Sequence, residues 1–128
     1  MIVDDELAEF DRDSHFYIPI EELKEEKDER WDDLIEGRWG AEGEVDPQTF
    51  KDVVVEAVER VIAANRGKNV AVVCHGGVIN AYFAHMLKLE FPMFFEPAYT
   101  SISRVLASSA GHRQVKSINE HAHVRALI

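Results

Sequence analysis

The chain has 128 residues, and 24 acidic residues against 14 lysines and arginines give it a formal net charge of −10 at pH 7. This excess of negative charge argues against a nucleic-acid partner, because phosphate backbones are bound by clustered lysine and arginine. A chain of this length buries roughly two thirds of its unfolded surface, enough for a hydrophobic core without disulfides or a structural metal. We therefore expect a single domain over residues 1–128.

The sequence also indicates the cellular compartment in which we expect the protein. Cys74 is the single cysteine, so it cannot form an intramolecular disulfide, and its apolar neighbours indicate a buried thiol in a reducing compartment. The sequence has no run of about 18 apolar residues that would span a membrane. Its early acidic residues Asp4, Asp5 and Glu6 are unlike the basic start of a secretory signal. We expect a cytoplasmic protein without a membrane partner.

The first third of the chain contains one predicted helix. Residues 1–17 show no clear period, which predicts a loop or a short extended piece. From Pro19 to about Glu36 the pattern is helical, because proline suits a first helical turn and Glu21 and Glu22 favour its positive end. Gly37 is a plausible end of this helix, and a surface loop is predicted for residues 40–45.

A second helix is predicted to begin at Asp46 and Pro47. Aspartate caps free N–H groups and proline fits the first turn, so the pair is a strong start signal. Asn65 and Gly67 end the pattern. Apolar residues recur between these limits at helical spacing: Phe50, Val53, Val54, Ala57, Val58, Val61 and Ile62.

The segment NVAVVCHGGVINA, residues 69–81, indicates a strand followed by a helix. Val70 to Cys74 are apolar and mostly β-branched, which predicts a parallel strand buried on both faces. The glycine pair allows a sharp turn into a helix from Gly76 to Leu87. His75 would then lie at the carboxyl end of a strand, beside free N–H groups where oxyanions bind. A strand–helix turn with a satisfied histidine is the equally open alternative.

The last third of the chain is predicted to end in a β-hairpin. Residues 90–100 are apolar but contain two prolines, which indicates an irregular segment over one end of the sheet, with a lid or a partner surface as the alternative. Strands are predicted over Ser101 to Ala107 and Arg113 to Glu120, joined by the turn Ser108 to His112. Helices that alternate with strands indicate a three-layer α/β architecture.

Several of these segments carry a family resemblance. VVCHGGVI resembles the second-histidine motif of the histidine phosphatase superfamily, the phosphoglycerate mutase-like proteins. LAEFDRDSHFYIPIEEL is similar to the segment that supplies an acidic proton donor there, and SISRVLAS and KSINEHAHV resemble the closing strands. The resemblance covers nearly all of the chain. It implies an α/β/α fold with a mainly parallel central sheet, and hydrolysis of a phosphorylated small molecule through a phosphohistidine, without a cofactor.

The resemblance also assigns roles to individual residues. His75 would donate a hydrogen bond to the phosphoryl oxygens, with the N–H of Gly76 beside it. Glu9 is the best match to the acid, and Asp11 is the near alternative. Ser101 resembles a position where the family places a small polar residue near the site. Asn80 stands where relatives often have arginine, so no role is assigned to its side chain.

One expected element is absent from the sequence. Members of the family begin with a strand that ends in Arg-His-Gly, whose histidine is the nucleophile, and this sequence has no such triplet. His15, the earliest histidine, cannot be the nucleophile, because it follows the presumed acid and lies between Ser14 and Phe16 instead of between arginine and glycine. We interpret the chain as the carboxy-terminal part of such a protein, with an incomplete sheet, and expect negligible phosphatase activity from it alone. The missing Tyr-Gly-x-Leu-x-Gly segment favours a phosphatase over a true glycerate mutase.

The absent strand would leave an open sheet edge. In the family it lies beside the strand that ends at His75, and an unpaired edge invites pairing with another chain. We therefore expect a homo-oligomer across this gap, or pairing of Val70 to Cys74 with the final strand. The alternative function is a noncatalytic domain for self-association or partner binding. His121 and His123 could face the same side of a strand, but no third ligand has convincing spacing, so we predict no metal site.

Overall fold

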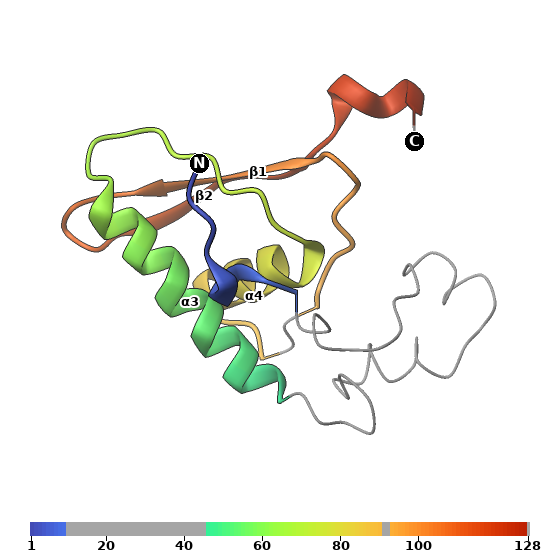
Figure 1. Ribbon diagram of the computed structural model, residues 1–128. Coiled ribbons are helices and arrows are strands. Elements are labelled where there is room, and N and C mark those ends of the chain that lie inside the picture. The colour runs from blue at the N-terminus through green and yellow to red at the C-terminus, as the bar shows by residue number, and fades with distance from the viewer. Residues whose placement is uncertain (10–45, 91–92, 128) are drawn as a thin grey trace.

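The computed structural model describes residues 1–9, 46–90 and 93–127, and these form a small mixed α/β arrangement (Figure 1). The helices are α3 (Pro47–Ala64) and α4 (Gly76–Leu87), and the strands are β1 (Ile102–Ala107) and β2 (Arg113–Glu120). Two 3-10 segments, η1 (Asp5–Leu7) and η3 (Ala122–Leu127), lie near the ends of the described chain. The helix predicted from Pro19 to Glu36 lies outside the described residues.

Helix α3 begins at the predicted cap. The Asp46 carboxylate accepts hydrogen bonds from the N–H groups of Gln48 at 3.3 Å and Thr49 at 3.2 Å. The Thr49 hydroxyl donates to the same carboxylate at 2.6 Å, and this bond is the main reason that the pKa of Asp46 lies below its ordinary value. At the other end, the Asn65 side chain donates to the Val61 carbonyl at 2.8 Å. Both predicted ends of this helix are confirmed.

The hydrophobic core lies between α3 and α4. Val54 and Ala57 of α3 are fully buried, as is Ala81 of α4, and Val78 and Tyr82 are nearly so. Leu7 of η1 and Val105 of β1 pack at the margin of this core, together with other partly buried residues. Helix α4 is apolar around most of its circumference, which allows it to pack against α3 and also to contact β2. In the part of the chain that the structure describes, neither helix combines the length and hydropathy that crossing a bilayer requires.

The predicted hairpin is confirmed. β1 and β2 pair antiparallel, with Val105 opposite Val115 and Ala107 opposite Arg113. Gly111 in the connecting turn has φ = 94°, a left-handed conformation that favours glycine. Figure 1 shows the hairpin on one side of the two helices, with η3 leading away from them.

A polar cluster joins the hairpin to both helices. The Arg113 guanidinium at the start of β2 binds the Glu59 carboxylate of α3 through Nε at 3.1 Å and Nη2 at 2.6 Å. The Tyr82 hydroxyl of α4 donates to the same carboxylate at 2.7 Å. Arg113 holds the pKa of Glu59 below its ordinary value, and burial, followed by Glu59, raises the pKa of Tyr82. The paired, partly buried groups therefore fix the hairpin against the helices.

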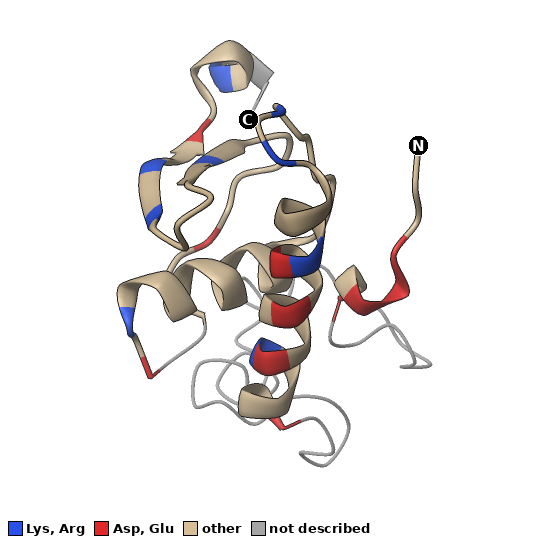
Figure 2. Cartoon of the chain, turned by 90° about the vertical axis from the view of Figure 1, so that its left-hand side faces the viewer, with Lys and Arg blue, Asp and Glu red and all other residues tan. Residues whose placement is uncertain are grey.

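The amino-terminal segment is attached to α3 by charge. Arg60 Nη2 lies 2.9 Å from an Asp4 carboxylate oxygen and 2.7 Å from one of Glu6. Figure 2 shows acidic residues on this segment and along α3, and basic residues on the hairpin. Such exposed ion pairs stabilise only slightly, but together with the packing of Leu7 they orient the segment that ends at Glu9.

The strand predicted from Val70 to Cys74 requires correction. The structure gives this segment no regular secondary structure, and its valines are exposed rather than buried on two faces: Val70 by 47%, Val72 by 43% and Val73 by 100%. The sheet formed by the described residues contains β1 and β2 alone. A strand needs a neighbour to bind its backbone N–H and C=O groups, and among the described residues this segment has none. The three-layer parallel sheet is accordingly not seen in them.

Candidate functional site

His75 is the residue that precedes the first turn of α4. Its backbone is extended, with φ = −91° and ψ = 172°, and its carbonyl accepts a hydrogen bond from the Ile79 N–H at 3.2 Å. Its imidazole makes no capping hydrogen bond to the helix and is exposed. The N–H groups of the first turn are thus open to another acceptor, at the positive end of the helix dipole.

Glu9 provides that acceptor. Its Oε2 accepts a hydrogen bond from the Gly77 N–H at 2.9 Å, although the two residues are 68 positions apart. The structure therefore brings Glu9, predicted as the acid, to the same helix end as His75. The amide that it binds belongs to Gly77 rather than to Gly76, the glycine that the sequence singled out. Asp11, the alternative acid, lies outside the described residues.

The two glycines of the turn have different surroundings. A Cβ at Gly77 would lie 2.8 Å from the Glu9 carboxyl carbon, closer than Cβ atoms approach in real structures, so any side chain there displaces the Glu9 carboxylate. A Cβ at Gly76 would lie 3.5 Å from Cδ of Pro97, an ordinary contact. Gly77 is thus the glycine whose missing side chain permits the carboxylate contact.

Cys74 immediately precedes His75 in the chain. Burial, and after it the negative charge of Glu9, raises the pKa of this thiol to about 11. A thiol with a raised pKa remains protonated near neutral pH and is a poor nucleophile. Cys74 is thus partly buried, whereas the sequence predicted a buried thiol.

Asn80 connects the first turn of α4 to the apolar segment after it. It is fully buried. Its Nδ2 donates to the carbonyls of Gly76 and Phe95, both at 2.9 Å. Its Oδ1 accepts from the N–H groups of Phe94 at 2.9 Å and Phe95 at 3.1 Å. No role was predicted for this side chain, although a polar residue four positions after Gly76 in a largely apolar helix was an available signal.

Asn119 holds the other end of the same segment. This residue of β2 has φ = 58°, and its Oδ1 accepts a hydrogen bond from the Ala98 N–H at 2.8 Å. The two asparagines fix residues 94–98, which places Pro97 against Gly76. The predicted irregular segment is confirmed for residues 93–100, and it forms a wall beside the amino-terminal end of α4.

The remaining candidate residues form no hydrogen bond to this helix end among the described residues. The Ser101 N–H donates to the Ala98 carbonyl at 3.0 Å, and Ser101 makes no hydrogen bond to His75, Gly76 or Glu9. His121 Nδ1 pairs with the Asn119 carbonyl at 2.7 Å, and His123 Nε2 with the Thr100 carbonyl at 3.0 Å. Over residues 1–9, 46–90 and 93–127, no three histidine, cysteine or acidic side chains gather in a group that could hold a metal ion.

Comparison with models of protein families gives a match over most of the chain. A family model described as the histidine phosphatase superfamily (branch 1) matches residues 1–121, a range that includes Glu9, His75 and the hairpin. No curated protein and no solved structure matches the chain.

Proposed function

Because the chain belongs to the histidine phosphatase superfamily, we propose that the amino-terminal end of α4 is a phosphate site that serves hydrolysis of a phosphorylated small molecule. The observation that carries this proposal is the exposed His75 beside the helix end whose Gly77 N–H binds the Glu9 carboxylate at 2.9 Å. A negatively charged carboxylate bound to an amide of the first helical turn marks a position where phosphate oxygens also bind favourably. The Glu9 carboxylate therefore has to move when phosphate binds.

The proposed chemistry divides into a phosphoryl transfer and a hydrolysis. A nucleophilic histidine forms a P–N bond as the P–O bond to the leaving group breaks, and Glu9, in its protonated carboxyl form, gives a proton to that leaving oxygen. Water then attacks the phosphorus, the P–N bond breaks, and the Glu9 carboxylate takes the proton that the water loses. His75 and the N–H of Gly76 stabilise the charge on the transferred phosphoryl oxygens. The nucleophile is absent from this sequence, so negligible turnover is expected from this chain alone.

The test is a phosphate titration of the ¹⁵N-labelled chain, followed through the Gly77 amide resonance. Inorganic phosphate is expected to shift this resonance, and His75→Ala to weaken the binding about tenfold, the loss of one charge-assisted hydrogen bond. His112→Ala, in the hairpin turn, is the matched control and leaves binding unchanged. A Gly77 resonance that does not respond to phosphate contradicts the site. Turnover of 4-nitrophenyl phosphate that is lost in His75→Ala contradicts the expected inactivity.

A second candidate function is self-association through Val70 to Cys74. The observation that favours it is the exposure of three valines in a segment without a strand partner among the described residues. A strand from a second copy would bind this backbone, cover the valines and extend the sheet toward the three-layer, mainly parallel arrangement of the family.

Analytical ultracentrifugation tests this second candidate. The chain is expected to dimerise at micromolar concentration, and Val73→Lys to make it monomeric, because a charged lysine blocks pairing at a strand edge. Val53→Lys, at a valine of α3 with 38% exposure, is the matched control and retains the dimer. A chain that stays monomeric at all concentrations contradicts the candidate.

A further inference from the structure

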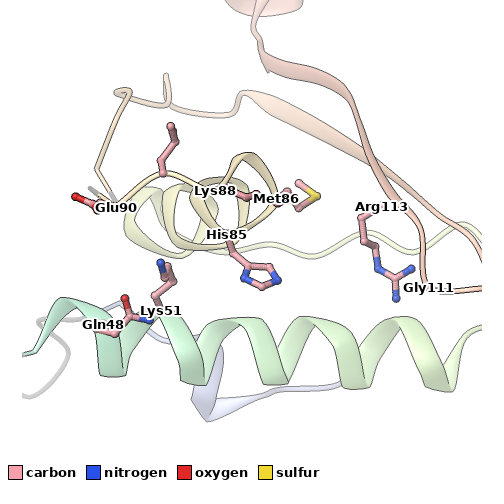
Figure 3. Close-up of a pocket in the computed structure, with 9 residues that line it drawn as sticks. Gln48, Lys51, His85, Met86, Lys88, Glu90, Gly111 and Arg113 are labelled. Carbon is pink, nitrogen blue, oxygen red and sulfur yellow. The ribbon is translucent and has the colours of Figure 1, made fainter.

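A groove lies between α3 and the carboxyl-terminal end of α4. Its volume is about 590 Å³, and it is lined by residues of both helices, of the chain after α4 and of the hairpin (Figure 3). Since α4 has 12 residues and a helix rises about 1.5 Å per residue, the groove lies roughly 18 Å from His75. It is therefore separate from the proposed phosphate site.

Two ammonium groups of this groove have no protein partner within the described structure. Lys51 of α3 is half-buried and Lys88 follows the last turn of α4, and the side-chain ammonium of neither residue forms a hydrogen bond or an ion pair there. Arg113 also lines the groove, but its guanidinium is bound by Glu59. Lys51 and Lys88 thus contribute two positive charges to the lining of this groove, on a chain whose formal net charge is −10.

The helix dipole explains only one of these lysines. Lys88 and His85 lie near the carboxyl end of α4, where cations are favoured. Lys51 lies in the second turn of α3, near the positive end of that helix, where a cation gains nothing from the dipole. Figure 3 shows Lys51 projecting from α3 toward α4, and His85 projecting from α4 toward α3.

The end of α4 does not repel an anion strongly. The Leu89 N–H donates to the Ala84 carbonyl at 2.9 Å, and the Lys88 N–H donates to the His85 carbonyl at 3.2 Å. These bonds cap two of the carbonyls that would otherwise present negative charge to the groove.

The remaining lining residues fit an organic molecule rather than a bare ion. Met86 and Leu89 supply an apolar surface, and Glu90 supplies a carboxylate that can accept hydrogen bonds from hydroxyl or amino groups. The volume is within the range of small-molecule sites, about 300 to 1,000 Å³. We propose that this groove binds a small organic phosphate of nucleotide size, with its phosphate on the ammonium groups of Lys51 and Lys88 and its organic part on Met86 and Leu89.

The test is a titration of the ¹⁵N-labelled full chain with adenosine 5′-monophosphate at low ionic strength. The dissociation constant is taken from the amide resonances of Met86 and Leu89, which report the groove alone. Lys51→Gln and Lys88→Gln are each expected to weaken binding about tenfold, since each removes a charge-assisted contact. Lys51→Arg keeps the positive charge and is expected to retain binding. Lys68→Gln, an exposed lysine in the turn after α3, is the control with the same charge change and retains wild-type affinity.

Three results would overturn the proposal. The first is no movement of the Met86 and Leu89 resonances up to millimolar nucleotide. The second is an equal loss in Lys68→Gln, which would indicate a response to net charge alone. The third is loss of binding in His75→Ala, which would mean that the nucleotide uses the other end of α4. Failure of the His75 site leaves the expected lysine effects unchanged, so the two proposals are distinguished.

Discussion

Helix α4 and the segment immediately before it are both apolar, yet they differ in what they bury. In α4, Val78 is 2% exposed and Ala81 is fully buried, whereas Val70 is 47% and Val73 100% exposed. A helix satisfies most of its backbone hydrogen bonds within itself, so it needs only a packed face. An extended segment takes all of its backbone partners from elsewhere. The contrast teaches that apolar side chains are buried only where the backbone that carries them is also satisfied.

The largest effect is expected where α4 binds the chain that follows it. Asn80→Ala removes four hydrogen bonds and leaves the partly buried N–H groups of Phe94 and Phe95 without their acceptor. The free energy of unfolding should fall by about 3 kcal/mol in urea denaturation. Asn65→Ala, which removes one hydrogen bond at the end of α3, is the control and should cost about 1 kcal/mol or less. Equal losses in the two variants would contradict the proposed importance of the buried asparagine.

The next prediction compares two valines directly. Val54→Ala removes two methyl groups from the core and should lower the free energy of unfolding by about 2 kcal/mol. Val73→Ala, at a fully exposed valine, should change it by less than about 0.5 kcal/mol. Both values come from the same urea titration of the monomer. A loss at Val73 as large as that at Val54 would mean that Val73 is buried within the monomer in solution, which would contradict the contrast between the two regions.

The same contrast explains which elements the sequence predicts. Asp46 and Pro47, the helical spacing of the valines in α3, and the turn around Gly111 are local signals, and the elements that they predict are present. Val70 to Cys74 carries the composition of a strand, but whether it becomes one depends on a neighbour that its own residues cannot specify. Long-range pairing is not contained in a short pattern.

The candidate site likewise combines local features, which the sequence predicts, with long-range contacts, which it does not. The glycine pair after His75 predicts the start of α4, and the family resemblance predicts Glu9 as the acid. The hydrogen bonds of Asn80 to Phe94 and Phe95 could not be predicted, because they are 14 and 15 positions away and leave no periodic trace. The catalytic roles of His75 and Glu9 remain predictions.

A smaller effect is expected from pH at the junction between the two regions. The pKa of Cys74 is raised to about 11 in the folded chain, from an ordinary value of 9.0. The folded state therefore favours the protonated thiol, and this contribution is complete below pH 9 and is lost as pH rises toward 11. We expect a loss of about 1 to 2 kcal/mol across this window, discounted for partial exposure. Unfolding of wild type and Cys74→Ala at several pH values isolates the effect, since Tyr82 titrates in both. Parallel pH profiles would contradict it.

The smallest effect on stability is expected at Gly77. This residue also offers the sharpest test of the contact between Glu9 and the start of α4. Gly77→Ala forces the Glu9 carboxylate away and breaks its hydrogen bond to the helix amide, which destabilises the fold. Alanine also has a higher helix propensity than glycine, by about 1 kcal/mol, which stabilises it. The net change in the free energy of unfolding should therefore stay within about 1 kcal/mol. Because Glu9 is the second cause of the raised pKa of Cys74, its departure should lower that pKa, and burial should keep it above 9.0. Gly76→Ala meets only Pro97 at an ordinary distance and should leave the thiol pKa unchanged. The pH dependence of the thiol's reaction with a disulfide reagent measures both variants. A lower pKa in Gly76→Ala but not in Gly77→Ala would mean that Glu9 does not bind this turn, and the phosphate site proposed there would lose its main support.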